Sequence, residues 1–243
     1  MLRAVIWDVD GTIAETEQHG HRVAFNEAFR RFGVPVVWSE EHYRELLAAR
    51  SGGKERMRYD FARRGICVSD ETIAAIHREK TKIFAEILAC GRIPLRAGVR
   101  RLIEELAEAG IAQALATTMH EDALAALLRA LLPEYEGLFT VRIAGDMVRA
   151  KKPDPEVYEK ALVALGVAPS EAVAIEDSEA GLIAARRAGL ACVVTYNEDT
   201  KDQDFSAAQL VVASLDARSA RWNPKGVDLS RGVTKDALEA VCG

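Results

Sequence analysis

The chain has 243 residues, and its 32 Lys and Arg against 37 Asp and Glu give a formal net charge of −5. This balance excludes nucleic acid or an anionic membrane as the default partner. The 49% hydrophobic and 28% charged residues are typical of a globular protein, and they exclude disorder, collagen and coiled coil as the main structure.

Cysteine usage and hydropathy bear on the compartment. The four cysteines, Cys67, Cys90, Cys192 and Cys242, occur singly, so the sequence indicates neither a zinc site nor a disulfide framework. No stretch approaches the ~18 consecutive apolar residues of a membrane span, and the first residues lack the pattern of a secretion signal. We therefore expect a cytoplasmic protein.

The chain begins with an apolar run of strand length at residues 2–9. The stretch from 15 to 92 that follows has helical periodicity and no convincing strand. Its expected helices span residues 21–32, 40–49, 55–64 and 71–88. This pattern predicts a helical cap, residues 15–92, inserted after the first strand, with a hinge where the chain leaves and re-enters the other domain.

From residue 93 onward, strand-length apolar runs alternate with helical segments. The expected strands span residues 112–117, 141–144, 172–175, 191–195 and 210–213, and the expected helices 99–109, 122–132, 155–165 and 180–188. The runs do not alternate with polar residues, as is typical of strands buried on both faces. The pattern predicts an α/β protein whose core, residues 1–14 and 93–215, is a doubly wound (Rossmann-like) parallel sheet. The segment 216–243 contains one expected helix, 235–241, and the sequence assigns it no role.

The first strand ends in the sequence Asp8-Val9-Asp10-Gly11-Thr12, which places two carboxylates at its carboxyl end. In such sheets ligands bind outside the carboxyl ends of the strands, and strand alternation aims both side chains the same way. Two like charges this close need a bound cation or a shared proton. An acid pair with Mg²⁺ is our leading hypothesis. A surface turn is the alternative, and a calcium loop fits poorly because its later ligands are missing.

Polar residues follow three further strands. They are Thr117 and Thr118 after the second strand, Lys151 and Lys152 after the third, and Glu176, Asp177 and Ser178 after the fourth. Each alone has an ordinary explanation, as a helix cap or a solvated charge. Together they put a hydroxyl, an ammonium and further carboxylates at the edge where Asp8 is expected.

This ordered set resembles the haloacid dehalogenase-like hydrolase superfamily. Its four motifs are matched by Asp8 with Asp10, by Thr117, by Lys152, which directly precedes a proline as in the family, and by Glu176 with Asp177. The resemblance extends over nearly the whole core and includes the position of the cap. It implies a helical-cap enzyme of phosphoryl transfer, with a small phosphorylated substrate.

The resemblance also implies a role for each motif residue. Asp8 would be the nucleophile that forms an aspartyl phosphate, and Asp10 the general acid and base. Thr117 and the backbone that follows it, at Thr118, would bind phosphate oxygens, while Lys152 would neutralise charge. The expected ligands of the Mg²⁺ cofactor are Asp8, the backbone carbonyl of Asp10 and Asp177. Glu176 would be either a further ligand or a residue that lies behind the ligands.

The start of the third cap helix suggests an anion site. Gly52 and Gly53 let the backbone come close to a ligand, and N–H groups at a helix start favour an anion. Lys54 and Arg56 add positive charge, so a second, non-reacting phosphate could be held there. A plain loop with solvated charges is the alternative.

Several cap strings, among them His21-Arg22 and Tyr43-Arg44-Glu45-Leu46-Leu47, resemble the branch of the family that includes xylulose-1,5-bisphosphate phosphatase, a Calvin-cycle accessory enzyme. The resemblance implies hydrolysis of this bisphosphate to xylulose 5-phosphate as metabolite repair. It also implies that Glu17, His21 and Tyr43 face sugar hydroxyls and that the protein is a monomer.

Other functions stay open at this point. Asp10 argues against the dehalogenase and cation-pump branches, and Thr12 argues against the sugar-phosphate mutases, which usually carry an aliphatic residue there. Lys80 nevertheless lies near the position where those mutases keep a lysine, so a β-phosphoglucomutase-like activity is the main alternative, followed by phosphoglycolate phosphatase. A phosphometabolite sensor without turnover is disfavoured because every motif residue is present.

Overall fold

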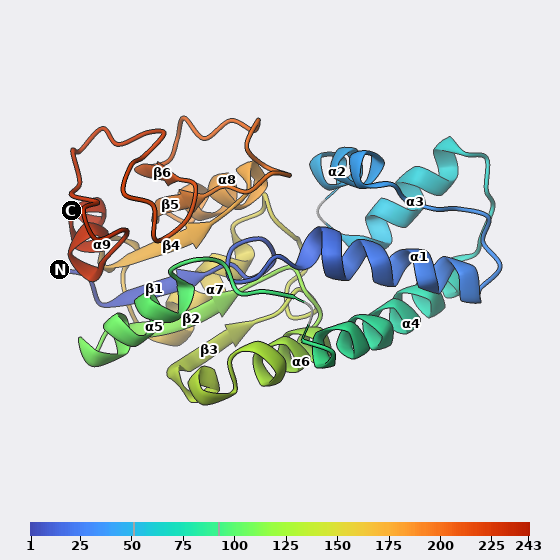
Figure 1. Ribbon diagram of the computed structural model, residues 1–243, viewed down its shortest axis with the longest axis horizontal. Helices are drawn as coiled ribbons and strands as arrows, with labels where there is room; N and C mark the ends of the chain where they lie inside the picture. Colours follow the sequence, from blue (N-terminus) through green and yellow to red (C-terminus); the bar gives the residue numbers. More distant parts are fainter. Residues whose placement is uncertain (51, 92) are drawn as a thin grey trace.

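The computed structural model describes residues 1–50, 52–91 and 93–243. Within these residues the centre of the protein is a parallel six-stranded sheet in the order β3-β2-β1-β4-β5-β6 (Figure 1). The strands are β1 (Ala4–Trp7), β2 (Ala112–Ala116), β3 (Phe139–Ile143), β4 (Ala172–Glu176), β5 (Ala191–Thr195) and β6 (Leu210–Val212). Because β1 pairs with both β2 and β4, the direction of winding reverses there, and ligands of such sheets bind at this switch point.

Helices cover both faces of the sheet because successive strand side chains point to opposite sides. Val5 and Trp7 of β1 lie in one apolar cluster, and Ala4 and Ile6 lie in the other. The core helices of the first cluster, which continues into the cap, are α5 (Val99–Glu108), α6 (Glu121–Leu131) and α9 (Lys235–Cys242), and those of the second are α7 (Glu156–Leu165) and α8 (Glu179–Arg187). The predicted fold class, a doubly wound parallel sheet with an inserted helical cap, is therefore confirmed.

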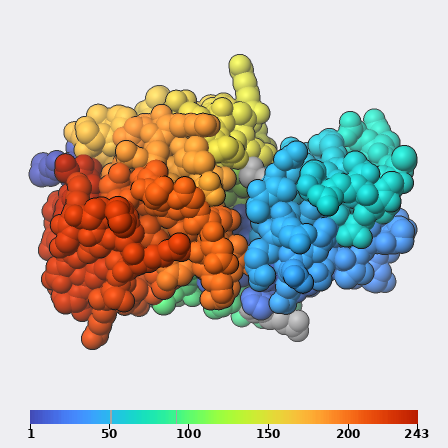
Figure 2. All heavy atoms as spheres, turned by 90° about the horizontal axis from the view of Figure 1, so that it is seen from above, coloured from blue at the N-terminus to red at the C-terminus, as the bar shows by residue number. Residues whose placement is uncertain are grey.

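The cap lies beside this core as a separate group of helices (Figures 1 and 2). They are α1 (Arg22–Arg31), α2 (Glu40–Ala49), α3 (Gly53–Arg63) and α4 (Asp70–Ala89), preceded by a π-helical turn, η1 (Glu17–His21). Trp38 packs between Phe25 and Phe29, with ring centroids 4.8 Å from each. These rings fill the interior of the cap and belong to the same apolar cluster as Val5 and Trp7 of β1.

The two chain crossings between core and cap lie side by side. The N–H of Glu15 donates to the carbonyl of Pro94 at 3.2 Å, and Ala14 forms an antiparallel bridge with Leu95. Arg96 anchors the return crossing, because its buried guanidinium donates to Glu15 and to the carbonyls of Tyr196 and Ala213. Residue 92, the predicted end of the cap, lies outside the described residues.

Element ends differ from the predicted ranges at several places. β1 is shorter than the predicted 2–9, and β3 begins before the predicted 141 because the short helix η2 (Pro133–Leu138) runs directly into it. The segment 216–243, which had no predicted role, covers one face of the sheet: Leu238 of α9 is fully buried, and Arg101 donates to the carbonyls of Leu215 and Val233.

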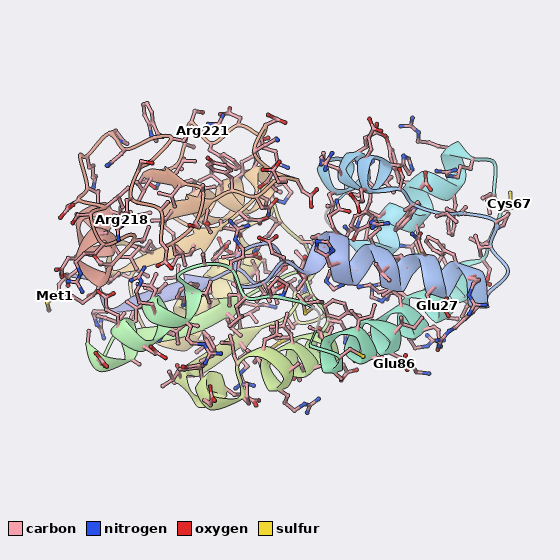
Figure 3. All side chains as sticks on the ribbon, in the orientation of Figure 1. Met1, Glu27, Cys67, Glu86, Arg218 and Arg221 are labelled. Atoms are coloured by element: carbon pink, nitrogen blue, oxygen red, sulfur yellow. The ribbon has the colours of Figure 1, made fainter. Side chains whose placement is uncertain are left out.

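Charged side chains surround both parts of the molecule, for example Glu27 and Glu86 on α1 and α4 and Arg218 and Arg221 in the last segment (Figure 3). Met1 and Cys67 mark opposite ends of the protein in the same view. In the described part of the chain, no helix combines the length and the apolar character needed to cross a membrane.

Candidate active site

One lysine and three acids meet at the carboxyl edge of the sheet. Asp8 follows β1. Glu176 is the last residue of β4 and Asp177 comes next, while Lys152 lies in the loop after β3. The Nζ atom of Lys152 donates to Asp8 Oδ1 and to Glu176 Oε1, both at 2.6 Å, and to the carbonyl of Ala116 at 2.9 Å. All four side chains are buried. Burial lowers the pKa of Lys152, but the two carboxylates outweigh it and hold this pKa above its ordinary value.

The three carboxylates form a candidate metal centre, since Asp8, Glu176 and Asp177 each offer an oxygen within 4.8 Å of the others. Burial, reinforced by Glu176 and opposed by Lys152, raises the pKa of Asp8 to about 7. Burial and the charges of Asp8 and Glu176 also raise the pKa of Asp177 well above its ordinary value. Among the described residues, the buried Oδ2 atom of Asp8 has no hydrogen-bond partner. A divalent cation with oxygen ligands would supply that partner and relieve the repulsion, so the residues fit Mg²⁺.

Glu176 is held differently from the other two acids. Its Oε1 atom accepts hydrogen bonds from Lys152 and from the hydroxyl of Tyr158, and its Oε2 atom accepts from the N–H of Asp177 at 3.3 Å. A cavity of about 660 Å³ is lined by Asp8 and Asp177 but not by Glu176. Glu176 therefore lies behind the other two acids and orients Lys152.

The backbone around Asp177 leaves no space for larger residues. Gly11 has a φ of +81°, and a Cβ atom there would lie 2.2 Å from Asp177 Oδ2. The same Oδ2 atom accepts a hydrogen bond from Asn197 Nδ2 at 2.8 Å. Neither Asn197 nor Tyr158 was predicted from the sequence. Asn197 lies just past the end of β5, separated from it by Tyr196, so its place at the strand end was a usable signal, whereas Tyr158 on α7 carried none.

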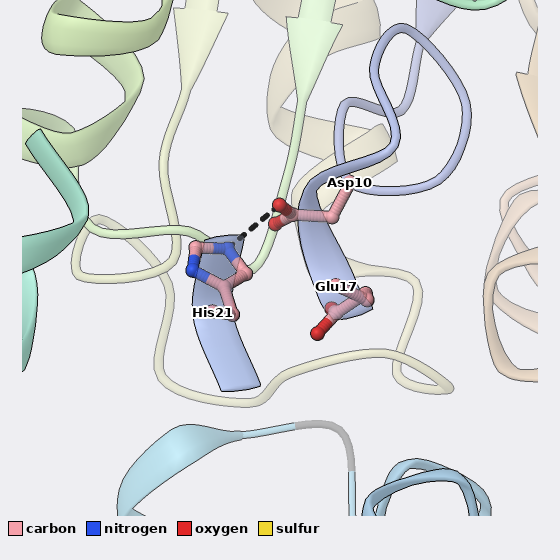
Figure 4. A group of neighbouring side chains, drawn as sticks. All are labelled: Asp10, Glu17 and His21. Carbon is pink, nitrogen blue, oxygen red and sulfur yellow. Dashed lines mark hydrogen bonds and ion pairs between the residues drawn. The ribbon is translucent and has the colours of Figure 1, made fainter. Parts of the chain in front are cut away.

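Asp10 lies on the cap side of the site, with its carboxylate turned toward η1 (Figure 4). Its Oδ1 atom accepts from Thr16 at 2.5 Å and lies 2.7 Å from His21 Nε2, while His21 Nδ1 lies 2.7 Å from Lys80 Nζ. Burial alone would raise the pKa of Asp10, but His21, Thr16 and Lys80 together lower it to about 2. Burial lowers the pKa of Lys80 to about 8. Asp10 is therefore ionised at neutral pH before substrate binds.

Glu17 forms a second group with cap residues. Tyr43 donates to Glu17 Oε2 at 2.7 Å, and Arg56 donates to the Tyr43 hydroxyl at 3.0 Å and lies 3.6 Å from Glu17. Asp10, Glu17 and His21 could also hold a metal by distance. Asp10 already accepts a hydrogen bond from Thr16, Glu17 contacts Tyr43 and Arg56, and His21 contacts Lys80. The cluster around Asp8 is therefore the better candidate metal centre.

A second cavity, of about 250 Å³, adjoins the first and shares Asp10, Glu17 and Thr118 with it. Gly52 and Gly53 fall at the start of α3, and Gly53 and Lys54 line this cavity together with Arg56, His77, His120 and Lys151. Burial, then the charges of Lys80, Lys54, Lys151 and His120, lower the pKa of His77 to about 2. The cavity is also lined by Asp10, Glu17, Glu55 and Asp146, so its positive charge is local and lies around His77.

The two threonines after β2 have different surroundings. The hydroxyl of Thr117 is buried and accepts from the N–H of Met119 at 3.0 Å, so its own proton stays available to donate. Thr118 lines both cavities. Lys151 lies 3.6 Å from Glu55 of α3 at the second cavity, away from Asp8.

Comparison with known proteins assigns the class. A model of haloacid dehalogenase-like hydrolases matches residues 2–189, and the chain belongs to this family. It is 44% identical to Protein CbbY of Rhodobacter capsulatus over 92% of this chain and 98% of that one. It is also 39% identical to a CBBY-like protein of Arabidopsis thaliana, over 86% of this chain and 67% of that one.

Two solved structures of CbbY from Rhodobacter sphaeroides are similar to this one. The complex with phosphate has 45% identity and a TM-score of 0.82, and covers 88% of this chain and 95% of that chain. A variant in complex with xylulose-(1,5)bisphosphate has 44% identity and a TM-score of 0.81, with the same coverage. The predicted family and the predicted enzyme class, a phosphatase, are confirmed.

Proposed function

We propose that the protein is a Mg²⁺-dependent phosphatase that converts xylulose 1,5-bisphosphate to xylulose 5-phosphate, as metabolite repair for carbon fixation. The observation that carries the proposal is the buried cluster of Asp8, Lys152 and Asp177, beside a cavity whose lining includes Lys54 and Lys151. The related CbbY structure that holds this bisphosphate supports the choice of substrate.

Asp8 is the nucleophile in this proposal. One of its carboxylate oxygens forms a bond to phosphorus as the bond to the sugar oxygen breaks, which gives an aspartyl phosphate. Lys152, 2.6 Å from Asp8, offsets negative charge during the transfer. The Thr117 hydroxyl and the Thr118 backbone bind phosphoryl oxygens. Mg²⁺, held by Asp8, Asp177 and the Asp10 carbonyl, would neutralise the transferred phosphoryl group.

Asp10 is the general acid and base. It gives its proton to the leaving sugar oxygen and then takes a proton from the water that hydrolyses the aspartyl phosphate. Its low pKa in the unliganded protein keeps the carboxylate deprotonated. The acid role needs a higher pKa, and a phosphate dianion bound beside Asp10 raises it because like charges disfavour ionisation.

The second cavity would hold the distal phosphate. Lys54, Lys151 and His120 line it, and neutral His77 can donate a hydrogen bond there. Glu17 and Tyr43 would meet the sugar hydroxyls between the two phosphates. The charges therefore favour a bisphosphate over a monophosphate of the same length.

A phosphate-release assay over sugar mono- and bisphosphates tests the proposal. We expect the highest kcat/KM for xylulose 1,5-bisphosphate, loss of turnover with EDTA, and recovery with added Mg²⁺. Turnover that survives EDTA, or a preference for phosphoglycolate, would contradict it. Incubation with β-glucose 1-phosphate separates the mutase alternative, because a mutase forms glucose 6-phosphate whereas a phosphatase forms glucose and phosphate. Binding without turnover of any compound would instead indicate a sensor.

Lys54→Ala tests the distal phosphate site. We expect kcat/KM to fall about tenfold or more for the bisphosphate, because a charge-assisted hydrogen bond is lost, and by less than about twofold for acetyl phosphate. Lys82→Ala is the matched control, since Lys82 is an exposed lysine that pairs with Glu79 on α4. Equal losses on both substrates would mean that Lys54 does not contact the distal group.

We also propose a monomer in the cytoplasm. All four cysteines are free thiols, and a reducing compartment maintains that state. Size-exclusion chromatography with light scattering measures the oligomeric state.

A further inference from the structure

The loop after β5, residues 196–203, contacts the cap through Asp199. The Oδ1 atom of Asp199 accepts from Gln18 Nε2 at 2.7 Å and from Arg44 Nε at 3.1 Å. Gln18 lies in η1 and Arg44 on α2, so one core carboxylate holds two cap elements. The side chain of Asp199 is only 12% exposed. Arg44 is 45% exposed, so solvent screens this pair on the side of Arg44, and the hydrogen bond from Gln18 adds a second contact with the cap.

Asn197 ties the same loop to the metal centre. Its Nδ2 atom donates to Asp177 Oδ2 at 2.8 Å, and its Oδ1 atom accepts from the backbone N–H of Asp199 at 2.9 Å. Thr200 braces the turn, because its hydroxyl accepts from the N–H of Asn197 at 3.0 Å. One asparagine side chain thus bridges a candidate metal ligand and the residue that holds the cap.

The contact from Asp199 bears on the active-site cavity because α2 forms part of its wall. Leu47, Ala48 and Ala49 of α2 line the cavity that Asp8 and Asp177 line from the core. Ala48 follows Arg44 by four residues, about one helical turn, so it lies on the same side of the helix. The position of Arg44 therefore sets how α2 closes over Asp8.

We propose that Asp199 is a positioning residue that latches α2 and η1 over the active site, and that Asn197, which also donates to Asp177, holds the loop that carries Asp199. The latch orders the cap side of the cavity, where the sugar portion of a substrate would lie, and leaves Asp8 and Lys152 themselves unchanged. The inference rests on the proposed phosphatase acting on a sugar phosphate, but the identity of the sugar is not needed for it.

The Asp199→Ala variant tests the latch. Asp202→Ala is the matched control, because it removes an exposed carboxylate from the same loop. For the best sugar phosphate we expect Asp199→Ala to lower kcat/KM about tenfold, while acetyl phosphate, whose leaving group does not reach α2, changes less than about twofold. Asp199→Asn keeps an acceptor for Gln18 but loses the charge that binds Arg44, so its loss should be intermediate. The exchanged pair Arg44→Asp with Asp199→Arg should recover part of the activity.

Small-angle X-ray scattering of the metal-free proteins supplies a readout that does not depend on turnover. The radius of gyration should increase in Asp199→Ala as the cap opens, and should match the wild type in Asp202→Ala. Equal behaviour of these two variants in scattering and in kcat/KM would overturn the latch. Absence of turnover in the wild type would refute the proposed function instead, and the scattering would still decide whether Asp199 holds the cap.

Discussion

Asp8→Asn is expected to lower phosphate release by roughly 10⁴-fold or more, because an amide cannot serve as the nucleophile that forms an aspartyl phosphate. The fold should be retained. The asparagine amide keeps an oxygen that can accept the hydrogen bond from Lys152. The substitution also removes one of three neighbouring carboxylates. Burial and the charge of Glu176 already disfavour ionisation of Asp8 and raise its pKa to about 7. In EDTA, the melting temperature of Asp8→Asn should therefore equal or exceed that of the wild type.

Phosphate release and thermal unfolding, measured on the same preparations, check this expectation. Asp202→Asn is a control of the same chemistry outside the site. A folded Asp8→Asn protein with activity within tenfold of the wild type would exclude Asp8 as the nucleophile. A large loss of melting temperature would show that the carboxylate cluster stabilises the fold, contrary to the electrostatics of the site.

Lys152→Met is expected to damage both activity and stability. The substitution leaves Asp8 and Glu176 buried without their cation, and breaking a buried ion pair on one side costs about 3–5 kcal/mol. Turnover should fall by roughly 10²-fold or more because the charge on Asp8 and on the phosphate is no longer offset. Urea unfolding at neutral pH measures the first effect, and the phosphate-release assay measures the second.

The neighbouring lysine provides the control. Lys151 pairs with Glu55 at 3.6 Å and its side chain is 29% exposed, so Lys151→Met should cost less than about 1 kcal/mol. The two variants differ by one position in the chain and by the burial of the ammonium group. Equal loss of stability in both would contradict the assignment of Lys152 to the centre of the site.

The sequence predicted the core of the site because Asp8 and Asp177 come directly after β1 and β4, and Lys152 lies farther along the loop after β3 at the same edge. Asp8, Lys152 and Asp177 needed only the rule that parallel strands end at one edge, and the structure brings them together. Asn197 obeys the same rule, but a single amide in a polar loop did not stand out. Asp199 could not be found this way, because its role depends on where α2 lies relative to the core.

The cap was harder to predict in detail. Lys54 and Arg56 were expected to hold one phosphate together, yet two residues along a helix are about 200° apart around its axis. In the structure both residues line the second cavity, but Arg56 is 5% exposed and donates to Tyr43, whereas Lys54 is less buried. The segment 216–243 posed a related difficulty, since its apolar residues gain a meaning only from the sheet face that they cover.

The side-by-side crossings at Glu15 and Pro94 have a consequence for how such proteins change over time. The chain leaves the sheet and returns to it at neighbouring points, so the cap is a single long insertion between two adjacent positions of the core. Exchange of this cap for another by recombination would leave every strand of the sheet and the positions of Asp8 and Lys152 unchanged. In the proposed function, substrate selectivity therefore resides in the cap and chemical reactivity in the core, and the two can evolve separately.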